Sequence, residues 1–491
     1  MRGDGFMNLS EFASYDGLGL AELVKNKQVT PKELVQLSIK AINELNPDLN
    51  AVVSILEEQA INEIESGLPK GSFTGVPFLI KELVLHAKDV PTSMGSRLAE
   101  NAVFPIDSEL MARFRKAGFV TVGTTTTPEF GYNAATEAVL YGPTRNPWNL
   151  NHSPGGSSGG SAASIAAGIV PVAHANDGGG SIRIPASCSG LIGLKPTRGR
   201  IPAGPFNSEP LNGIAIEFAL TKTVRDTAHL LDAVSGPDIG CYGWPEAPSE
   251  EYKQLIEKPV KPLKIAWTGR PATGVAVDEE CIQALHETVQ LCRDLGHIVV
   301  EDTPKYNAEQ FSLATLNIWT ANIYKMIEGA AKLTGKIPTE KNIEAAIWQC
   351  YLYGREMRAS DLLEAIETNA TVSRTVGHFF TDYDVLLSPT IATLPAEIGV
   401  LNANNPNIDA KQWTEQIFTY APFTNLFNAT GQPSISLPLK TSKNGLPIGM
   451  QFTGRFADEA TLLQLASQLE KATPWKDKRP NIHVSNITNT I

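Results

Sequence analysis

Apolar and polar positions alternate with two different periods along the chain, which predicts helices and strands in turn. Near the N-terminus, apolar side chains recur at the three- and four-residue spacing of a helix. Thr30 is the expected N-cap, Pro31 takes the first helical position and Glu33 completes a capping box. Asn46 and Pro47 are expected to end this helix, because proline lacks a backbone N–H and disfavours helical geometry in the residue before it.

Short apolar runs beside these helical patterns are typical of buried strands. One run covers residues 76–80 and ends on Lys81. A helix capped by Ser108 and closed by Gly118 precedes a second run at residues 119–122. Each run has the length of a strand, so a helix and a strand alternate here.

The same design recurs further along the chain. Asp278 caps a predicted helix that stops at Gly296, and a strand follows at residues 298–300. The segments "DYDVLLSPT" and "GQPSISLPLKTSKNGLPIGMQF" add further buried strands. Alternating patterns of this kind favour an α/β protein in which helices cover a mixed sheet. Between residues 235 and 262, spaced prolines indicate a surface excursion or a subdomain boundary.

Composition and charge narrow the class of protein. The chain has 491 residues, of which 42% are hydrophobic and 19% charged, so it has the composition of a globular protein. Its net charge is −11, and the basic clusters of a nucleic-acid-binding protein are missing. No stretch of about 18 apolar residues occurs, so we expect no membrane-spanning helix.

The N-terminus and the cysteines bear on the compartment. The first residues lack the apolar core of a signal peptide, and either Met1 or Met7 could be the native start. The five cysteines are scattered and form no CxxC pair, which favours buried free thiols in a reducing compartment. We therefore expect a cytoplasmic protein.

The stretch "SPGGSSGGSAASIAAGIVPVAHANDGGGSIRIPASCSGLIGLKPTRGR", residues 153–200, is the chain's main candidate for chemistry. It holds 11 glycines but no GxxxxGK[ST] pattern for phosphate. GxSxG elbows surround Ser157 and Ser158, yet the preceding segment is polar and rich in turns, where an elbow follows an apolar strand. His152 and His174 are too isolated to indicate a metal site.

A second glycine cluster, "NDGGGSIRIP", leads into Ser181. Successive backbone N–H groups at such a turn can converge on an anion, which would place Ser181 beside an oxyanion hole. The alternative is a tight turn in which the serine is merely tolerated. A serine nucleophile needs a base, and Lys81 is a candidate because burial disfavours its charged form. The alternative for Lys81 is a solvated residue at a strand end.

Long, ordered motifs in this chain resemble those of the amidase signature family. They include "GVPFLIKE" around Lys81, "GGSSGGSAASIAAG" around Ser157 and "NDGGGSIRIPASCSGLIGLKPTRGRI" around Ser181. The resemblance runs from about residue 16 to residue 480. It implies a large, twisted mixed sheet with helices on both faces.

The resemblance also implies how the chain is organised. We expect a single domain over residues 1–491 with a catalytic core at about 72–202. A mostly helical excursion is expected at about 305–380, and further strands of the sheet at about 381–475.

The resemblance further implies a Ser-cisSer-Lys triad. Ser181 is the expected nucleophile, Lys81 the base, and Ser157 the bridging serine, preceded by a cis peptide bond from Gly156. No histidine is needed for this chemistry, and neither a metal nor a cofactor is implied.

Family precedent places the oxyanion hole on the backbone N–H groups of Gly178, Gly179, Gly180 and Ser181. It assigns supporting roles to the side chains of Ser158, Asp177 and Arg183. Two positions depart from the family pattern: Glu82 stands where aspartate is usual, and "HANDGGGS" replaces the commoner "GTDTGGS" type.

The segments "ANDGGGSIRIPAS" and "TPWKDKRP" are most similar to the 6-aminohexanoate-cyclic-dimer hydrolase branch of the family. They imply a hydrolase of small linear or cyclic amides that works through an acyl-enzyme, with Trp319 and Tyr132 as candidates to narrow the acyl pocket. Two alternatives remain: the glutaminase subunit of a tRNA-dependent amidotransferase, and a catalytically silent binding module. Family habit favours a homodimer.

Overall fold

A computed structural model describes residues 7–487 of the chain. Of the two alternative starts, Met7 is the first described residue, whereas Met1 lies outside the described residues. Within the described residues, none of the helices combines the length and the apolar character needed to cross a bilayer. The five cysteines carry free thiols, and all but Cys241 are buried.

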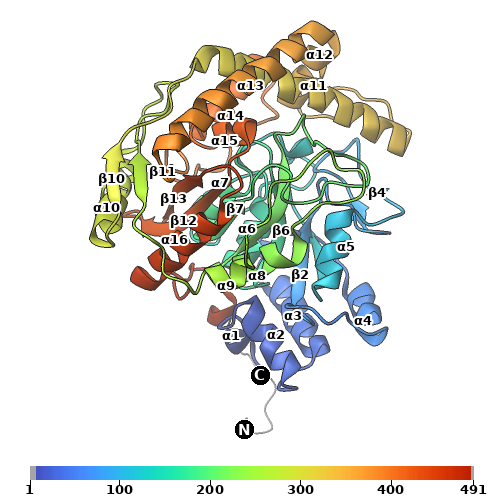
Figure 1. Cartoon of the computed structure of the whole chain (residues 1–491). Helices are drawn as coiled ribbons and strands as arrows, with labels where there is room; N and C mark the ends of the chain where they lie inside the picture. The colour runs from blue at the N-terminus through green and yellow to red at the C-terminus, as the bar shows by residue number, and fades with distance from the viewer. Residues whose placement is uncertain (1–6, 488–491) are drawn as a thin grey trace.

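A large mixed β-sheet forms the centre of the molecule (Figure 1). Among the described residues it has 11 strands, in the spatial order β1-β5-β2-β6-β8-β7-β12-β13-β11-β9-β10. Their bounds are β1 Val52–Ile55, β2 Pro77–Lys81, β5 Val120–Thr125, β6 Val172–Asp177, β7 Ile192–Lys195, β8 Ile216–Thr221, β9 Lys264–Trp267, β10 Ile298–Glu301, β11 Val385–Pro389, β12 Ser434–Thr441 and β13 Pro447–Gly454. A separate small sheet pairs β3 (Pro91–Thr92) with β4 (Ala102–Val103).

The central strands are buried on both faces, which requires helices on both sides of the sheet. Every residue of β2, β5, β6 and β13 is buried, although alternate side chains point to opposite faces. The helices are α1 Leu9–Phe12, α2 Gly17–Lys25, α3 Pro31–Leu49, α4 Glu57–Glu65, α5 Glu109–Lys116, α6 Gly159–Ala166, α7 Arg183–Ser189, α8 Val224–Val234, α9 Tyr252–Leu255, α10 Glu279–Asp294, α11 Ala308–Thr334, α12 Ala345–Glu356, α13 Ala359–Asp382, α14 Ala410–Tyr420, α15 Asn425–Thr430 and α16 Glu459–Ala472. The prediction of a mixed sheet enclosed by helices is confirmed.

The segment near residues 305–380, expected to be mostly helical, forms α11, α12 and α13. These helices lie together at the top of the view in Figure 1, away from the N-terminal helices α1 to α3. Both α12 and α13 pack against α11. The proline-spaced segment at 235–262 contains only the short helix α9, and it exposes Ile239, Tyr242 and Trp244.

The expected end of the first long helix was wrong. Helix α3 continues through Pro47 to Leu49, and Asn50 ends it in the left-handed conformation. The amide of Asn46 explains the extension, because its side-chain oxygen accepts from the backbone N–H groups of Ala51 and Val52, at 2.8 Å each. These bonds secure the chain beyond the last turn, while Leu49 is fully buried.

The other end of α3 has the predicted capping box. Glu33 N donates to Thr30 Oγ1 at 3.2 Å, and Thr30 N donates to the Glu33 carboxylate at 2.6 Å.

Thr30→Ala removes the first of these bonds and should lower the free energy of unfolding by about 1 kcal/mol. The midpoint of urea-induced unfolding measures this change. Lys40→Ala, an exposed change within α3, is the matched control, and an equal shift in both variants would contradict the capping role.

Candidate active site

Lys81 ends β2 and points its side chain into the protein interior, where it is fully buried. Its Nζ lies 2.6 Å from Ser157 Oγ, 3.1 Å from Ser158 Oγ and 2.6 Å from Asn176 Oδ1. Strand β2 pairs in parallel with β6, which carries Asn176 near its end. The two strands therefore deliver the lysine and the asparagine to the same edge of the sheet.

The three partners of Lys81 can also satisfy the hydrogen-bonding capacity of a neutral amine. Asn176 Oδ1 can only accept, so it takes one N–H of the lysine. Ser158 Oγ donates to the backbone carbonyl of Asn176 at 3.3 Å, which leaves its lone pairs for a second N–H. The amine lone pair then remains for the hydroxyl proton of Ser157. This arrangement would let Lys81 take a proton from Ser157.

Burial favours the neutral form of Lys81. Desolvation lowers the pKa of the ammonium well below its usual range, and the carboxylates of Glu217 and Asp177 act in the opposite direction. A lysine in its neutral form is a competent general base.

Ser157 and Ser158 lie in the loop that enters α6. The peptide bond between Gly156 and Ser157 is cis, as the family resemblance implies. A side chain at Gly156 would place its Cβ 2.6 Å from the carbonyl oxygen of Ala135, so the loop passes too close to its neighbour for any other residue.

Ser181 and its three preceding glycines connect β6 to α7. Neither the Ser181 hydroxyl nor the backbone N–H groups of Gly178, Gly179, Gly180 and Ser181 donate to any other group within residues 7–487. The Ser157 and Ser181 hydroxyls are not hydrogen-bonded to each other. A cluster of unpaired backbone N–H groups is the arrangement that binds a developing oxyanion.

Close packing explains why this turn is made of glycine. A Cβ on Gly178 would lie 2.9 Å from the Trp319 ring, and one on Gly180 would lie 2.5 Å from Thr424 Oγ1. Gly180 also has a φ of 140°, which L side chains rarely adopt. Thr424 secures the turn, because its hydroxyl donates to the carbonyl of Gly179 at 2.6 Å.

Asp177 and Arg183 form a fully buried ion pair across the base of the glycine turn. Arg183 Nε and Nη2 donate to the carboxylate of Asp177 at 2.9 and 2.8 Å. The remaining donors of the guanidinium reach the Thr424 carbonyl, Gln451 and Asn428 at 2.6–2.8 Å. Although burial alone would raise the pKa of Asp177, Arg183 lowers it to about 2. The pair stays ionised and fixes both ends of the turn.

Two residues near Lys81 were missed by the sequence analysis. Asn176 accepts a hydrogen bond from the lysine, and Glu217 on β8 lies directly opposite Asn176 in the antiparallel pairing of β6 with β8. The signal for Asn176 was its place in the unusual "HANDGGGS" segment. The signal for Glu217 was a single carboxylate within a mostly apolar strand.

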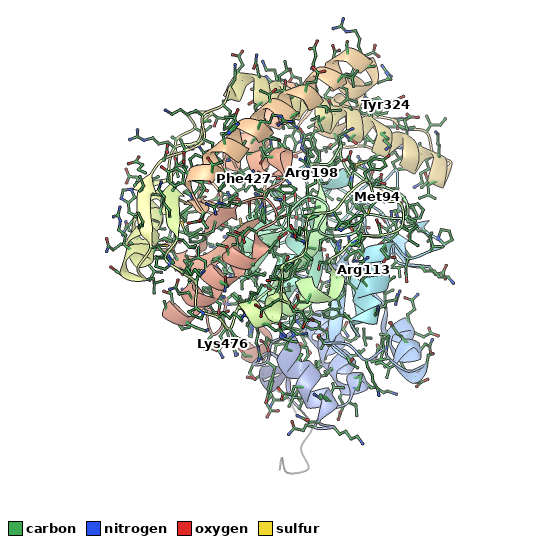
Figure 2. The ribbon with its side chains drawn as sticks, viewed as in Figure 1. Met94, Arg113, Arg198, Tyr324, Phe427 and Lys476 are labelled. Carbon is green, nitrogen blue, oxygen red and sulfur yellow. The ribbon has the colours of Figure 1, made fainter. Side chains whose placement is uncertain are left out.

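A cavity of about 620 Å³ opens in front of these groups and is lined by Ser157, Asn176, Ser181 and Glu217. Trp319 of α11 also lines the cavity, and its ring stacks on Tyr132 with 4.4 Å between centroids. Tyr132 is behind this ring, and its hydroxyl is hydrogen-bonded to the Thr414 hydroxyl at 2.7 Å. Met94, another lining residue, is labelled in Figure 2, as is Tyr324 on α11.

No cluster of three or more histidine, cysteine, aspartate or glutamate side chains suited to a metal ion occurs within residues 7–487. His174 is fully buried behind Lys81, and burial, followed by the charge of Lys81, lowers its pKa well below the usual range.

The fold and the motifs of this site define an amide-hydrolysing enzyme, and the chain belongs to the amidase family. The family model described as Amidase matches residues 33–463. The chain is 37% identical to 6-aminohexanoate-cyclic-dimer hydrolase of Paenarthrobacter ureafaciens over 477 residues, which cover 95% of this chain and 96% of that protein. It is 33% identical to the lipoamidase of Enterococcus faecalis over 506 residues, with 96% of this chain and 66% of that protein covered.

Solved structures show the same relationship. A structure of 6-aminohexanoate cyclic dimer hydrolase complexed with substrate superposes with a TM-score of 0.91 at 34% identity, covering 96% of this chain and 99% of that one. A bacterial aryl acylamidase of the amidase signature enzymes superposes with a TM-score of 0.82 at 27% identity, covering 96% and 97%. The fold of this chain is therefore that of the amidase signature enzymes.

Breaking the buried ion pair should be costly. Asp177→Asn leaves the Arg183 charge buried without a counter-ion, and we expect the free energy of unfolding to fall by about 3–5 kcal/mol. Urea-induced unfolding measures the loss. Glu109→Gln, which breaks the partly exposed pair with Arg113, should cost no more than about 1 kcal/mol. Equal losses in the two variants would show that the Asp177–Arg183 pair has no special structural role.

Proposed function

We propose that this chain is a serine amidase that cleaves the C–N bond of small amides through an acyl-enzyme on Ser181. The hydrogen-bonding environment of Lys81 carries the proposal. A fully buried lysine with two fixed acceptors and a serine hydroxyl on its third position has the arrangement of a general base.

In the acylation step, Ser157 gives its proton to Lys81 and takes the proton of Ser181. The Ser181 oxygen attacks the amide carbon, and the carbonyl oxygen becomes an oxyanion held by the backbone N–H groups of residues 178–181. Collapse of the tetrahedral intermediate breaks the C–N bond. The leaving nitrogen takes the proton back from Lys81 through Ser157, so an ester on Ser181 and a free amine result.

In the deacylation step, water attacks this ester. Lys81, through Ser157, takes a proton from the water, and Ser181 recovers a proton when the acyl group leaves as a carboxylic acid. The contact between Ser157 and Ser181 must form when substrate binds, because the two hydroxyls are not hydrogen-bonded in the free protein. Catalytic hydrogen bonds of this kind often tighten only in the complex with substrate.

The apolar part of the cavity favours a substrate with an aliphatic chain. The side chains of Leu83, Phe130, Leu211, Trp319 and Met326 line it. Apolar walls of this kind bind methylene groups by excluding water. Since 6-aminohexanoate-cyclic-dimer hydrolases are similar to this chain over nearly its full length, we propose a linear or cyclic aliphatic amide related to that dimer.

The glutaminase component of a tRNA-dependent amidotransferase is less well supported. A glutamyl-tRNA(Gln) amidotransferase component from Thermotoga maritima superposes with a TM-score of 0.71 at 26% identity, below the values for the cyclic-dimer hydrolase.

Substitution of the base and the bridging serine tests the mechanism. Lys81→Ala and Ser157→Ala should each lower kcat/KM by about 100- to 10,000-fold, because general acid–base catalysis is lost. The assay follows hydrolysis of 6-aminohexanoate cyclic dimer by the purified chain. Ser164→Ala is the matched control on α6, where the hydroxyl donates only to the Gly160 carbonyl within its own helix. Turnover close to wild type in Lys81→Ala would contradict the assignment of the base.

Activity of the isolated chain tests the substrate class. We expect the purified protein, without a partner or a tRNA, to hydrolyse one amide bond of the cyclic dimer and release the linear dimer, because the proposed chemistry is complete within one chain. Chromatography of the reaction products measures this release. Hydrolysis of glutamine but of no aliphatic amide would favour the amidotransferase component instead.

A further inference from the structure

Glu217 places a carboxylate beside the proposed catalytic base. It lies on β8, directly opposite Asn176 on β6, and its side chain is 11% exposed. Its Oε2 is 4.0 Å from His174 Nε2, whereas its buried Oε1 has no hydrogen-bond partner within residues 7–487. The carboxylate also lines the cavity that contains Ser157 and Ser181.

Among the described residues, Lys81 is the cation whose charge lowers the pKa of Glu217. This distinguishes Glu217 from the other carboxylates near Lys81. Asp177 is already paired with Arg183 in a fully buried ion pair. Glu82, the next residue after β2, accepts from the backbone N–H groups of Ser93 and Gly95 and is not among the charges that act on Lys81.

The remaining charged or titratable groups near β8 have other partners, lie half-buried on α8 or line the cavity. On α8, Arg225 pairs with Asp16, and Asp226 and Asp232 accept backbone N–H groups; His229 is half-buried on the same helix. Lys195 on β7 donates to the Pro196 carbonyl. His86, Glu209, Lys325 and Lys332 line the same cavity as Glu217. Helix α6 contributes only glycine, serine, alanine and isoleucine.

We propose that Glu217 is a positioning residue for the amidase reaction: it orients the Asn176 amide toward Lys81 and sets the pH at which Lys81 becomes a free base. This inference rests on the proposed role of Lys81 as the general base.

The asparagine amide supplies the first part of the argument. Asn176 Nδ2 donates to the Leu83 carbonyl at 2.9 Å, and the same amide group faces the Glu217 carboxylate. The Leu83 carbonyl and the cross-strand carboxylate of Glu217 both favour the orientation in which Nδ2 turns toward them and Oδ1 faces Lys81. Without a carboxylate at position 217, this orientation is held by fewer groups.

The charge of Glu217 supplies the second part. A carboxylate near an ammonium stabilises the ammonium, so an ionised Glu217 raises the pKa of Lys81 and opposes the effect of burial. Burial in turn raises the pKa of Glu217 to about 8, while the charge of Lys81 and the Asn176 amide act to lower it. The two groups therefore compete for a proton.

The test measures how fast a fluorophosphonate labels Ser181 as a function of pH, which requires no knowledge of the natural substrate. In wild type the rate should rise with pH as Lys81 loses its proton. Glu217→Gln keeps an acceptor for the Asn176 amide but removes the charge that stabilises the Lys81 ammonium. We expect the rising limb of the profile to move to lower pH by about one pH unit.

Two further variants distinguish a charge effect from a structural one. Glu217→Asp keeps the charge on a shorter side chain, and its limb should lie between those of the wild type and Glu217→Gln. Glu82→Gln removes a buried carboxylate next to Lys81 in sequence and should leave the limb where it is in wild type. This comparison applies to variants whose circular dichroism matches that of the wild type.

Three results would contradict the proposed role of Glu217. A limb in Glu217→Gln that coincides with the wild-type limb would overturn the inference while leaving Lys81 as the base. A limb in Glu217→Asp that coincides with that of a shifted Glu217→Gln would also overturn it, because the charge would then have no effect. Labelling of wild type that never reaches Ser181 would overturn the proposed function, and the role of Glu217 with it.

Discussion

The burial of one lysine is the constraint on which the rest of this site depends. An ammonium removed from water is unstable unless it is paired, and of the two carboxylates that act on Lys81, Asp177 is already paired with Arg183 and only Glu217 remains. The structure instead surrounds Lys81 with hydroxyl and amide groups that suit a neutral amine. The chemistry we propose follows from this, because a lysine that remained charged could not accept a proton.

The sheet makes this burial possible. Strands β2, β6 and β8 are neighbours, although they are far apart along the chain, and helices cover both of their faces. Lys81, Asn176 and Glu217 come from these three strands in that order. The loop into α6 and the glycine turn into α7 then bring Ser157 and Ser181 to the same cavity. Rigid strands hold these three side chains, and within the described residues the turn between β6 and α7 leaves its backbone N–H groups free.

Local sequence patterns predicted most of the elements but not the contacts between them. The caps at Thr30, Ser108 and Asp278 are where the pattern placed them, because a cap depends on residues only two or three positions apart. The extension of α3 through Pro47 was missed, since it depends on hydrogen bonds that the Asn46 side-chain oxygen accepts from residues beyond the helix.

The candidate site was likewise predicted only in part from the sequence. Family motifs pointed to Lys81, Ser157 and Ser181, whose roles stay predictions. Glu217 could not be found in this way, because its proposed role comes from cross-strand pairing with Asn176 on a different strand.

The most direct test of the central claim is to label the purified protein with a fluorophosphonate and map the modified peptide. We predict a single adduct on Ser181; an adduct on Ser157 or Ser158, or no adduct at all, would contradict the proposed mechanism.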